Sequence, residues 1–272
     1  MNILVIGGGG REHSICWSVK KSKICKSIYC IPGNAGISEI AECSELDLNK
    51  KNKLVEFCKI KKIDLVIIGP EKYLENGLSD YLTNKNINVF GPSKKAAMLE
   101  TSKSFAKKFL TKFKINTAKY KEFLSHYDAF KFISNVKYPI VIKADGLASG
   151  KGVLICNNKI EAEKAINTIM KEKKFGSAGK KIIIEEFLSG FEISYFAFFD
   201  KNGFKKLGYA LDHKRAYENN KGPNTGGMGC FLPSKRVTKR IEKEIEEKIL
   251  KPTSAGFKKE KLIYRGILFF GL

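Results

Sequence analysis

The chain has 272 residues, 43% of them hydrophobic and 29% charged, which is typical of a globular protein with a sizeable core. No stretch approaches the roughly 20 consecutive apolar residues of a membrane-spanning helix, so we expect no membrane partner. The net charge of +22 suggests nucleic acid, but the lysines lie in small groups mixed with glutamate, which favours solvated helix faces over a specific nucleic-acid surface.

The N-terminus and the cysteines both indicate a cytoplasmic protein. Residues 1–13, MNILVIGGGGREH, read as a strand running into a glycine turn and lack the features of a signal peptide. The seven cysteines are scattered, form no C-x-x-C pair and have no histidine cluster near them. This favours reduced thiols over disulfides or a metal site.

The first part of the chain alternates short apolar runs with segments of helical length. This alternation predicts a parallel sheet built from βαβ units. The predicted strands are residues 3–6, 27–31, 64–68 and 88–90, and the predicted helices include residues 13–20, 54–61 and 75–82.

A turn rich in glycine or proline follows each of these strands. In open α/β sheets, ligands bind beyond the carboxyl ends of the strands, so we expect the turns to share one edge and face one cleft. Turns of this kind favour Gly and Pro in any protein, which accounts for some of them. The turns are residues 7–10, 32–36, 69–71 and 91–93.

The first turn does not match the fingerprint of nicotinamide-binding proteins. The pattern G-x-G-x-x-G, started at Gly7, would need a third glycine where the chain has Glu12. The second strand also runs into Pro32-Gly33-Asn34 and not into the expected acidic residue. We therefore expect a Rossmann-like sheet with a different, phosphorylated ligand.

One long helix is expected after Ser93, which would be its N-cap, and Lys103 would lie inside it. A lone lysine on a helix is usually solvated. An α+β segment follows over about residues 116–188, with one helix at residues 161–171.

The stretch 138–152, YPIVIKADGLASGKG, is the clearest indication of a ligand. A short apolar run, residues 139–142, predicts a buried strand that delivers Lys143 to its end, and residues 153–156 predict a second strand. The glycines between them enclose Lys151. Because such a turn lets backbone N–H groups approach a polyanion, the pattern indicates a nucleoside triphosphate. An ordinary glycine-rich hairpin with solvated lysines remains an alternative.

A Walker A loop, G-x-x-x-x-G-K followed by Ser or Thr, does not fit this stretch. Gly146 and Gly150 are separated by one residue too few, and Gly152 stands where the hydroxyl should be. A strand is expected next, where a Walker A loop needs a helix.

Residues 181–188, KIIIEEFL, predict a strand whose backbone could read an adenine edge, with Glu192 accepting from ribose hydroxyls. Without further context, an edge strand with solvent-facing glutamates would be the favoured interpretation of this segment. Residues 191–199 and 204–211 then predict a hairpin, which leads into DHKR and the uncharged loop GPNTGGMG. Loops with close backbone approach often hold ligands.

The last part of the chain predicts an amphipathic helix at residues 238–250 and an apolar strand at residues 267–272. We expect that final strand to be unpaired. Domains seldom end this way, so the chain looks cut at its C-terminal end.

Several motifs, taken together and in this order, resemble one family, the phosphoribosylamine-glycine ligases. These are ATP-grasp enzymes of purine synthesis, also called glycinamide ribonucleotide synthetases. KADGLASGKG alone would indicate only a general ATP-grasp protein, and DHKR with GPNTGGMG narrows the resemblance to this ligase. The other matching stretches are VIGGGGREH, PGNAG, IGPE, FGPS and IEEFLSG.

The resemblance implies an α/β and α+β fold, with a Rossmann-like parallel sheet followed by an ATP-grasp fold that is incomplete at its C-terminal end. The implied domains are residues 1–100 and residues 101–272, with residues 120–190 as the smaller lid of the second. The implied reaction is ATP-dependent ligation of glycine to 5-phosphoribosylamine through a glycyl phosphate. Its products are glycinamide ribonucleotide, ADP and phosphate.

The family pattern also implies roles for individual residues. Lys103 and Lys143 would contact the ATP phosphates, and Glu192 would bind ribose. Adenine would be framed by Glu185, Phe187 and Leu188, and further ATP contacts would come from Gly150, Lys151 and Gly152. Catalysis is assigned to Lys143, Lys151, Asp212, Lys214 and Arg215. The substrates phosphoribosylamine and glycine are expected at Gly9, Gly10, Arg11, Glu12, Gly33, Asn34, Gly69, Pro70, Glu71, Pro223, Asn224, Thr225 and Gly226.

The family normally continues with a strand whose glutamate and asparagine hold Mg²⁺ or Mn²⁺, and then with a C-terminal domain. We therefore expect the metal ligands to lie beyond residue 272 and none to lie within the chain. The alternative to an active ligase is a catalytically impaired nucleotide-binding fragment, or one subunit of a split ligase with a separate C-terminal fragment as its partner. Lys72 and Tyr73 also depart from the family pattern, which puts only local loop geometry in doubt.

Overall fold

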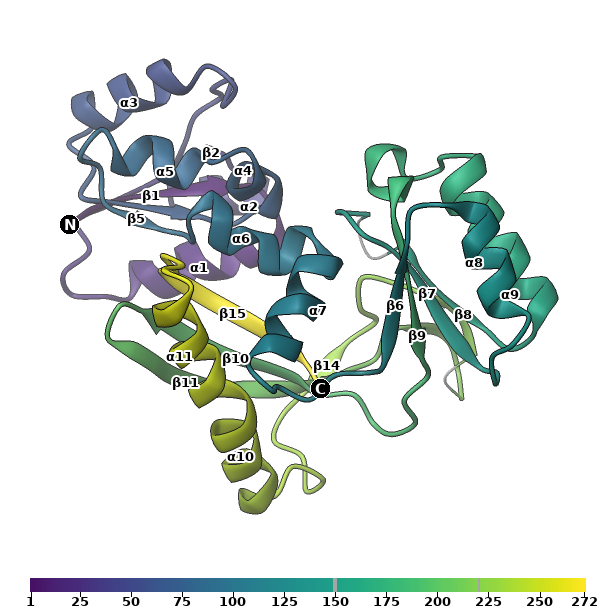
Figure 1. The fold of residues 1–272 in the computed structure, drawn as a ribbon. Coiled ribbons are helices and arrows are strands. Elements are labelled where there is room, and N and C mark those ends of the chain that lie inside the picture. The colour runs from purple at the N-terminus through teal and green to yellow at the C-terminus, as the bar shows by residue number, and fades with distance from the viewer. Residues whose placement is uncertain (149–150, 220) are drawn as a thin grey trace. The chain divides into compact units, whose positions relative to one another are not determined.

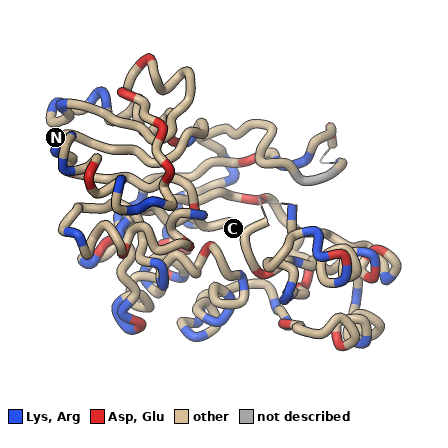
Figure 2. The backbone as a smooth tube through the Cα atoms, turned by 90° about the horizontal axis from the view of Figure 1, so that it is seen from above, with Lys and Arg blue, Asp and Glu red and all other residues tan. Residues whose placement is uncertain are grey.

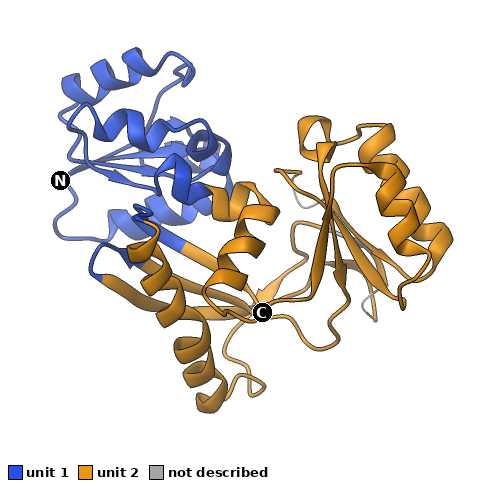
Figure 3. Cartoon of the chain, in the orientation of Figure 1, with its two compact units in different colours: residues 1–97, 199–202, 261–267 blue, residues 98–198, 203–260, 268–272 orange. Residues whose placement is uncertain are grey.

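The structure is a computed structural model that describes residues 1–148, 151–219 and 221–272. It divides into two compact units (Figure 3). Unit 1 comprises residues 1–97, 199–202 and 261–267, and unit 2 comprises residues 98–198, 203–260 and 268–272. Within the described ranges, the helices are all too short or too polar to traverse a lipid bilayer.

Unit 1 is built on a five-stranded sheet in the order β3-β2-β1-β4-β5, with every pairing parallel (Figure 1). The parallel sheet and its four predicted strands are confirmed. The strands are β1 (Asn2–Gly7), β2 (Ser27–Pro32), β3 (Glu42–Cys43), β4 (Leu65–Ile68) and β5 (Val89–Phe90). The helices are α1 (Gly10–Lys20), α2 (Ala35–Ser38), α3 (Lys51–Ile60), α4 (Glu71–Glu75) and α5 (Leu78–Thr83).

The unbroken apolar run of β1 is explained by its central place in this sheet. Leu4 and Ile6 pack into one buried cluster, whereas Ile3 and Val5 pack into another. Successive side chains of a strand point to opposite faces, so both faces of the sheet are covered.

The single helix predicted at residues 75–82 is wrong, because α4 ends at Glu75 and α5 begins at Leu78. Gly77 lies between them with a φ of +69°, a left-handed conformation that glycine adopts without steric cost. The long helix predicted after Ser93 is likewise two helices, α6 (Lys94–Thr101) and α7 (Lys103–Lys112).

Ser93 is confirmed as an N-cap, since its Oγ accepts from the N–H of Ala96 (3.2 Å). Ser102 has an extended backbone and caps the second helix, accepting at Oγ from the N–H of Phe105 (3.2 Å). Lys103 is therefore the first residue of α7 and not an interior one.

Unit 2 contains a four-stranded antiparallel sheet in the order β6-β9-β7-β8. Its strands are β6 (Tyr120–Phe123), β7 (Ile140–Ala144), β8 (Val153–Cys156) and β9 (Ile182–Glu186). Helices α8 (His126–Ile133) and α9 (Lys159–Ile166) cover one face (Figure 1). The strand-turn-strand prediction for residues 138–156 is confirmed, as is the helix near residues 161–171, which ends in a π-helical turn, Asn167–Lys171.

Alternation along β7 and β9 gives this sheet two chemically different faces. Ile140, Ile142 and Ile184 join the buried cluster beneath α8 and α9. Val141 lies opposite Glu185 in the register, so Lys143, two residues along, shares their face. One face is therefore core and the other carries charge.

A further four-stranded sheet, most of whose residues belong to unit 2, has the order β14-β11-β10-β15. Its strands are β10 (Ser194–Asp200), β11 (Gly203–Asp212), β14 (Cys230–Phe231) and β15 (Gly266–Gly271), and β12 (Arg215–Tyr217) pairs separately with β13 (Lys221–Asn224). The predicted hairpin is β10 and β11. The strand expected to be unpaired is β15, which lies next to β10 in the sheet.

The amphipathic helix predicted at residues 238–250 is confirmed. It begins as α10 (Lys239–Ile245) with Thr238 as its N-cap, and continues through a π-helical turn into α11 (Lys251–Lys259). Along both units, Lys and Arg recur with Asp and Glu between them (Figure 2).

A substitution at Gly256 in α11 would test how tightly α11 packs on α7. A Cβ at this position would lie 2.5 Å from Cζ of Phe109 and 2.9 Å from Cδ2 of Phe113. Alanine favours a helix over glycine by about 1 kcal/mol, whereas overpacking costs about 1–3 kcal/mol. We therefore expect Gly256→Ala to lower the free energy of unfolding, measured by urea denaturation. Gly10→Ala is the control, because its Cβ would meet nothing within 4 Å. A Gly256→Ala midpoint at or above that of the wild type would contradict this packing.

Candidate functional site

The carboxyl edge of the sheet in unit 1 brings together three of the four turns that were expected to share it. The N–H of Gly33 donates to the carbonyl of Gly7 (3.2 Å), and the side-chain amide of Asn34 donates to the carbonyl of Gly8 (2.9 Å). The N–H of Gly69 donates to the carbonyl of Ile6 in β1 (3.0 Å). Three turns that are distant in sequence are thereby joined at one edge.

Glu12 fills the space between these turns. Its carboxylate is buried, accepts from the N–H of Gly9 (2.7 Å) and pairs with Arg11 (2.9 Å). A Cβ on Gly69 would lie 2.1 Å from Oε1 of Glu12, so only glycine fits there. Arg11 also pairs with Glu71 (2.7 Å) and keeps about half of its side chain exposed. Glu12 supports the turns from within, while Arg11 faces solvent.

A second group of charged residues forms in unit 2, on the face of the β6-β9-β7-β8 sheet opposite α8 and α9. Lys103 and Lys107 lie one turn apart on α7, so they share one side of that helix. Nζ of Lys107 donates to Oγ1 of Thr117 (2.7 Å) and to the carbonyl of Ala118 (3.1 Å), and it lies 3.3 Å from Oε2 of Glu185.

Lys143 reaches the same carboxylate oxygen from β7, because its Nζ lies 2.8 Å from Oε2 of Glu185. The side chains of Lys107 and Glu185 are only 9% and 5% exposed, whereas that of Lys143 is 26% exposed. The other oxygen, Oε1 of Glu185, is buried and has no hydrogen-bond partner among the described residues. A buried acceptor without a partner is costly, so this oxygen is suited to a donor supplied by a ligand.

The three lysines carry more positive charge than Glu185 neutralises. Burial is the main cause that lowers the pKa of both Lys103 and Lys107, and the charge of Lys143 lowers each further. A surplus of partly desolvated ammonium groups attracts polyanions, of which a triphosphate is one.

The glycine turn connects β7 to β8 next to this cluster. Ser149 and Gly150 lie outside the described residues, so the expectation for Gly150 has no structural counterpart here. Lys151 is exposed, and Gly152 is buried, where a Cβ would lie 2.6 Å from that of Ala148.

The residues expected around adenine and ribose follow β9. Phe187 and Leu188 come directly after the strand and are 40% and 64% exposed, so they leave apolar surface that a ligand could cover. Glu192 pairs with Lys214, whose Nζ also lies 3.7 Å from Oδ2 of Asp212. The structure thus brings Glu192 together with two residues assigned to catalysis.

DHKR and GPNTGGMG form one hydrogen-bonded assembly. The N–H of His213 donates to the carbonyl of Gly229 (2.9 Å), and the N–H of Thr225 donates to the carbonyl of Lys214 (2.7 Å). Arg215 donates to the carbonyl of Gly222 (2.6 Å). Of the substrate residues expected here, Pro223 and Asn224 are described by their backbone in β13, and Gly226 has open space at its Cα.

Sequence reasoning missed Lys107. The signal was present as its spacing of four from Lys103, which places both on one helix side, but its partner Glu185 could not be foreseen. Among the described residues, no three His, Cys, Asp or Glu side chains are grouped so as to hold a metal ion.

Comparison with known protein families identifies the chain. The model for "Phosphoribosylglycinamide synthetase, N domain" matches residues 1–100, and that for "Phosphoribosylglycinamide synthetase, ATP-grasp (A) domain" matches residues 101–272. The chain belongs to the phosphoribosylglycinamide synthetase family. The resemblance seen in the motifs is thereby confirmed, together with the order of a parallel N-terminal sheet and an ATP-grasp fold.

Individual relatives agree with this family. The chain is 47% identical over its whole length to phosphoribosylamine–glycine ligase of Caldanaerobacter subterraneus subsp. tengcongensis, and it spans 65% of that protein. The crystal structure of the Thermotoga maritima ligase superposes with a TM-score of 0.84 at 35% identity, over all of this chain and 65% of that one. The biotin carboxylase domain of Hydrogenobacter thermophilus 2-oxoglutarate carboxylase matches with a TM-score of 0.74 over 99% of this chain and 60% of that one; at 18% identity this shows the fold alone.

The shared carboxylate predicts an order of stability for two variants. Glu185→Gln leaves the buried Lys107 without its anion, and removing one partner of a buried pair costs roughly 3–5 kcal/mol. Lys143→Met leaves the Lys107–Glu185 pair intact and should cost less than half as much. Urea denaturation of both variants measures the difference. An equal or larger loss in Lys143→Met would show that Lys107 is not the principal partner of Glu185.

Proposed function

We propose that unit 2 binds ATP, whose phosphates contact Lys103, Lys143 and the glycine turn. We also propose that this ATP drives the ligation reaction of the family. The observation that carries the proposal is the buried carboxylate of Glu185, held by Lys107 and Lys143 with one oxygen left without a partner. This arrangement suits a ligand with a polyanion at one end and a hydrogen-bond donor at the other. The relative from Hydrogenobacter thermophilus is described in complex with the magnesium salt of ADP, which supports this assignment.

The nucleotide would extend from the lysines toward the end of β9. Phe187 and Leu188 offer exposed apolar surface to adenine, and Oε1 of Glu185 offers an acceptor to its amino group. Glu192 would bind ribose. Lys151, with Gly150 and Gly152, would complete the phosphate contacts from the glycine turn.

The remaining substrates are assigned by the family pattern. Phosphoribosylamine and glycine would use the turns of unit 1, with Gly9, Gly10, Arg11, Glu12, Gly33, Asn34, Gly69, Pro70 and Glu71. In unit 2 they would use Asp212, Lys214 and Arg215 with Pro223, Asn224, Thr225 and Gly226. These turns offer backbone N–H groups, and Arg11 offers charge, as a phosphorylated sugar requires. We also propose residues 1–100 and 101–272 as the two domains, with residues 120–190 as the lid of the second, a division supported by the bounds of the family matches.

The reaction needs an activated carboxyl group, because a glycine carboxylate is a poor electrophile. Transfer of the γ-phosphoryl group gives glycyl phosphate and ADP. The amine of phosphoribosylamine then forms the C–N bond as the C–O bond to phosphate breaks, releasing phosphate. Lys143, Lys151 and Lys103 would stabilise the transferring charge, and closure of the turn would exclude water from the acyl phosphate.

The carboxylates of the described residues do not fit a divalent cation. Glu185 is held by lysines, Glu192 and Asp212 face Lys214, and Asp145 accepts from Ser104. We propose that Mg²⁺ or Mn²⁺ arrives with the nucleotide and that its protein ligands lie outside residues 1–272.

The chain spans 65% of the length of its first relatives, which favours a second possibility. In this case the chain would bind nucleotide, but it would catalyse ligation only together with another polypeptide, as one subunit of a split ligase or as a fragment. All seven cysteines are free thiols, which supports placing either form in the cytoplasm.

Calorimetric titration of the chain with ATP, with and without Mg²⁺, tests the nucleotide site. We expect saturable binding that Lys143→Met weakens by at least about tenfold, or about 1.4 kcal/mol. Lys239→Met, which changes an exposed lysine on α10, is the matched control and should bind as the wild type does. Formation of ADP that requires both glycine and phosphoribosylamine would distinguish a ligase from a nucleotide-binding component. Absence of ATP binding by well-folded protein would refute the proposal.

The lowered pKa of Lys103 predicts a pH dependence. The phosphates need the charged ammonium, so ATP affinity should fall as pH rises through a pKa below the ordinary 10.5. Bound phosphates raise the pKa of Lys103 again. ATP binding at a pH between the pKa of the free protein and that of the complex should therefore take up protons. The uptake is measured as a dependence of the binding enthalpy on the ionisation enthalpy of the buffer. Lys103→Met should reduce the uptake, with Lys107 as the remaining lysine of lowered pKa, and an unchanged proton uptake in that variant would exclude Lys103 as a source.

A further inference from the structure

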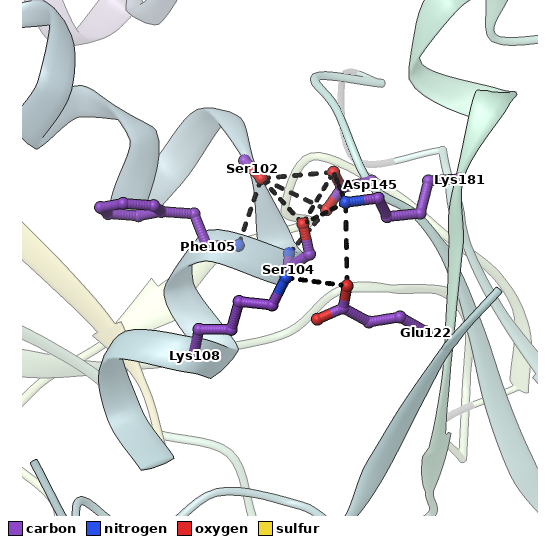
Figure 4. A network of polar contacts seen from close by, with 7 residues as sticks. All are labelled: Ser102, Ser104, Phe105, Lys108, Glu122, Asp145 and Lys181. Atoms are coloured by element: carbon purple, nitrogen blue, oxygen red, sulfur yellow. Dashed lines mark hydrogen bonds and ion pairs between the residues drawn. The ribbon is translucent and has the colours of Figure 1, made fainter. Parts of the chain in front are cut away.

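Asp145 lies where β7 passes into the glycine turn, and it joins that turn to the start of α7 (Figure 4). Its Oδ1 accepts from the N–H of Ser104 (2.6 Å), and its Oδ2 accepts from the hydroxyls of Ser104 (3.0 Å) and Ser102 (3.2 Å). Its own N–H donates to the carbonyls of Ala178 and Lys181 (3.1 Å each). Three segments distant in sequence therefore meet at one residue.

The first N–H groups of α7 are all used within this network. Helices leave these groups without intrahelical partners, and phosphates often bind them. Here the N–H of Lys103 donates to the carbonyl of Asp145 (3.0 Å), and that of Ser104 donates to its carboxylate. Phe105 and Ala106 donate to Oγ and to the carbonyl of Ser102. Asp145 thus occupies the anion position of this helix, and a phosphate nearby must be bound by side chains.

Lys103 is tied to the glycine turn at both of its ends. Its N–H donates to the backbone carbonyl of Asp145, and its Nζ donates to the backbone carbonyl of Gly146 (3.1 Å). The place of this lysine relative to the turn is therefore set by residues 145 and 146 rather than by α7 alone.

The charge of Asp145 is balanced locally. Nζ of Lys181 donates to Oγ of Ser104 (3.0 Å) and lies 3.8 Å from Oδ2 of Asp145 and 3.7 Å from Glu122. Lys108 lies 3.3 Å from the same glutamate. Asp145 and Glu122 thus alternate with Lys181 and Lys108. The carboxylate of Asp145 is paired by Lys181, so the ammonium of Lys103 is not needed as its counter-ion.

We propose that Asp145 is a positioning residue for nucleotide binding, which holds Lys103 and the first residues of the glycine turn in one fixed geometry so that both meet the same phosphates. This inference rests on the proposed ATP site and adds to it a residue that acts through Lys103. Asp145 itself does not touch the nucleotide.

A double-mutant cycle tests this role. Asp145→Asn keeps the size of the side chain but removes its charge, and we expect it to weaken ATP binding about tenfold by calorimetry. In a Lys103→Met background the same change should weaken binding less than about twofold, because the two residues act as one unit. An equal weakening in both backgrounds would overturn the proposal.

Ser102→Ala is the control for a merely structural role. It removes the hydroxyl that caps Phe105 and donates to Oδ2 of Asp145, but it leaves both bonds from Ser104 to Asp145 and both ties of Lys103. We expect it to lower the denaturation midpoint as Asp145→Asn does, with ATP affinity changed less than about twofold. If Ser102→Ala weakens ATP binding as much as Asp145→Asn, the effect is one of helix stability and the proposal fails.

Amide hydrogen exchange without nucleotide keeps this test separate from the proposed function. Asp145→Asn should speed exchange at Lys103, Ser104 and the start of the glycine turn, whereas Ser102→Ala should speed it mainly at Phe105. If the wild type binds no ATP, the proposed function fails, and positioning by Asp145 is judged on exchange alone. Unchanged exchange at Lys103 and Ser104 in Asp145→Asn would overturn it.

Discussion

The charged site of unit 2 depends on one carboxylate oxygen, Oε2 of Glu185, which two lysines share. Glu185 comes from β9, Lys143 from β7 and Lys107 from α7, so this single oxygen ties a helix to two strands. Buried charges persist only when they are paired, which forces the three side chains into one arrangement. Lys143, the more exposed of the two lysines, is thereby held at the edge of the cluster where a ligand can reach it.

This arrangement follows from the period of two along β7 and β9. Ile140 and Ile142 enter the core beneath α8 and α9, and the residues between them face the opposite side. A shift of the register by one residue would bury Lys143 among apolar side chains and expose the isoleucines. The apolar residues that stabilise the sheet therefore also fix the direction of Lys143.

The longer apolar strands and the glycine turns could be predicted from the sequence because their signals are local. The short strands β3, β12 and β14, the strand β13 where a loop was expected, the helix breaks and the side-chain partners could not. Leu74, Leu78 and Leu82 all join one core cluster, so their spacing of four resembles a single helix across the break at Gly77. In the same way, the apolar residues on both sides of Ser102 concealed its role as an N-cap. The motif KADG indicated Lys143 from the sequence. The partners of Lys107 and Asp145 lie on β9 and α7, which are distant from them in sequence or unrecognisable as neighbours until the chain is folded.

The hydrogen bonding of the first N–H groups of α7 distinguishes this site from a phosphate-binding loop of the Walker type. In such a loop the backbone N–H groups at a helix start face the phosphates, and their position is fixed by the helix. Here those groups are consumed by Asp145 and Ser102, so the positive charge is delivered by lysine side chains. Lysine side chains can change conformation without breaking a helix or a strand, so contacts of this kind do not depend on the N–H groups at a helix start. The carboxylate of Asp145 binds the start of α7, and its N–H ties the start of the turn to Ala178 and Lys181.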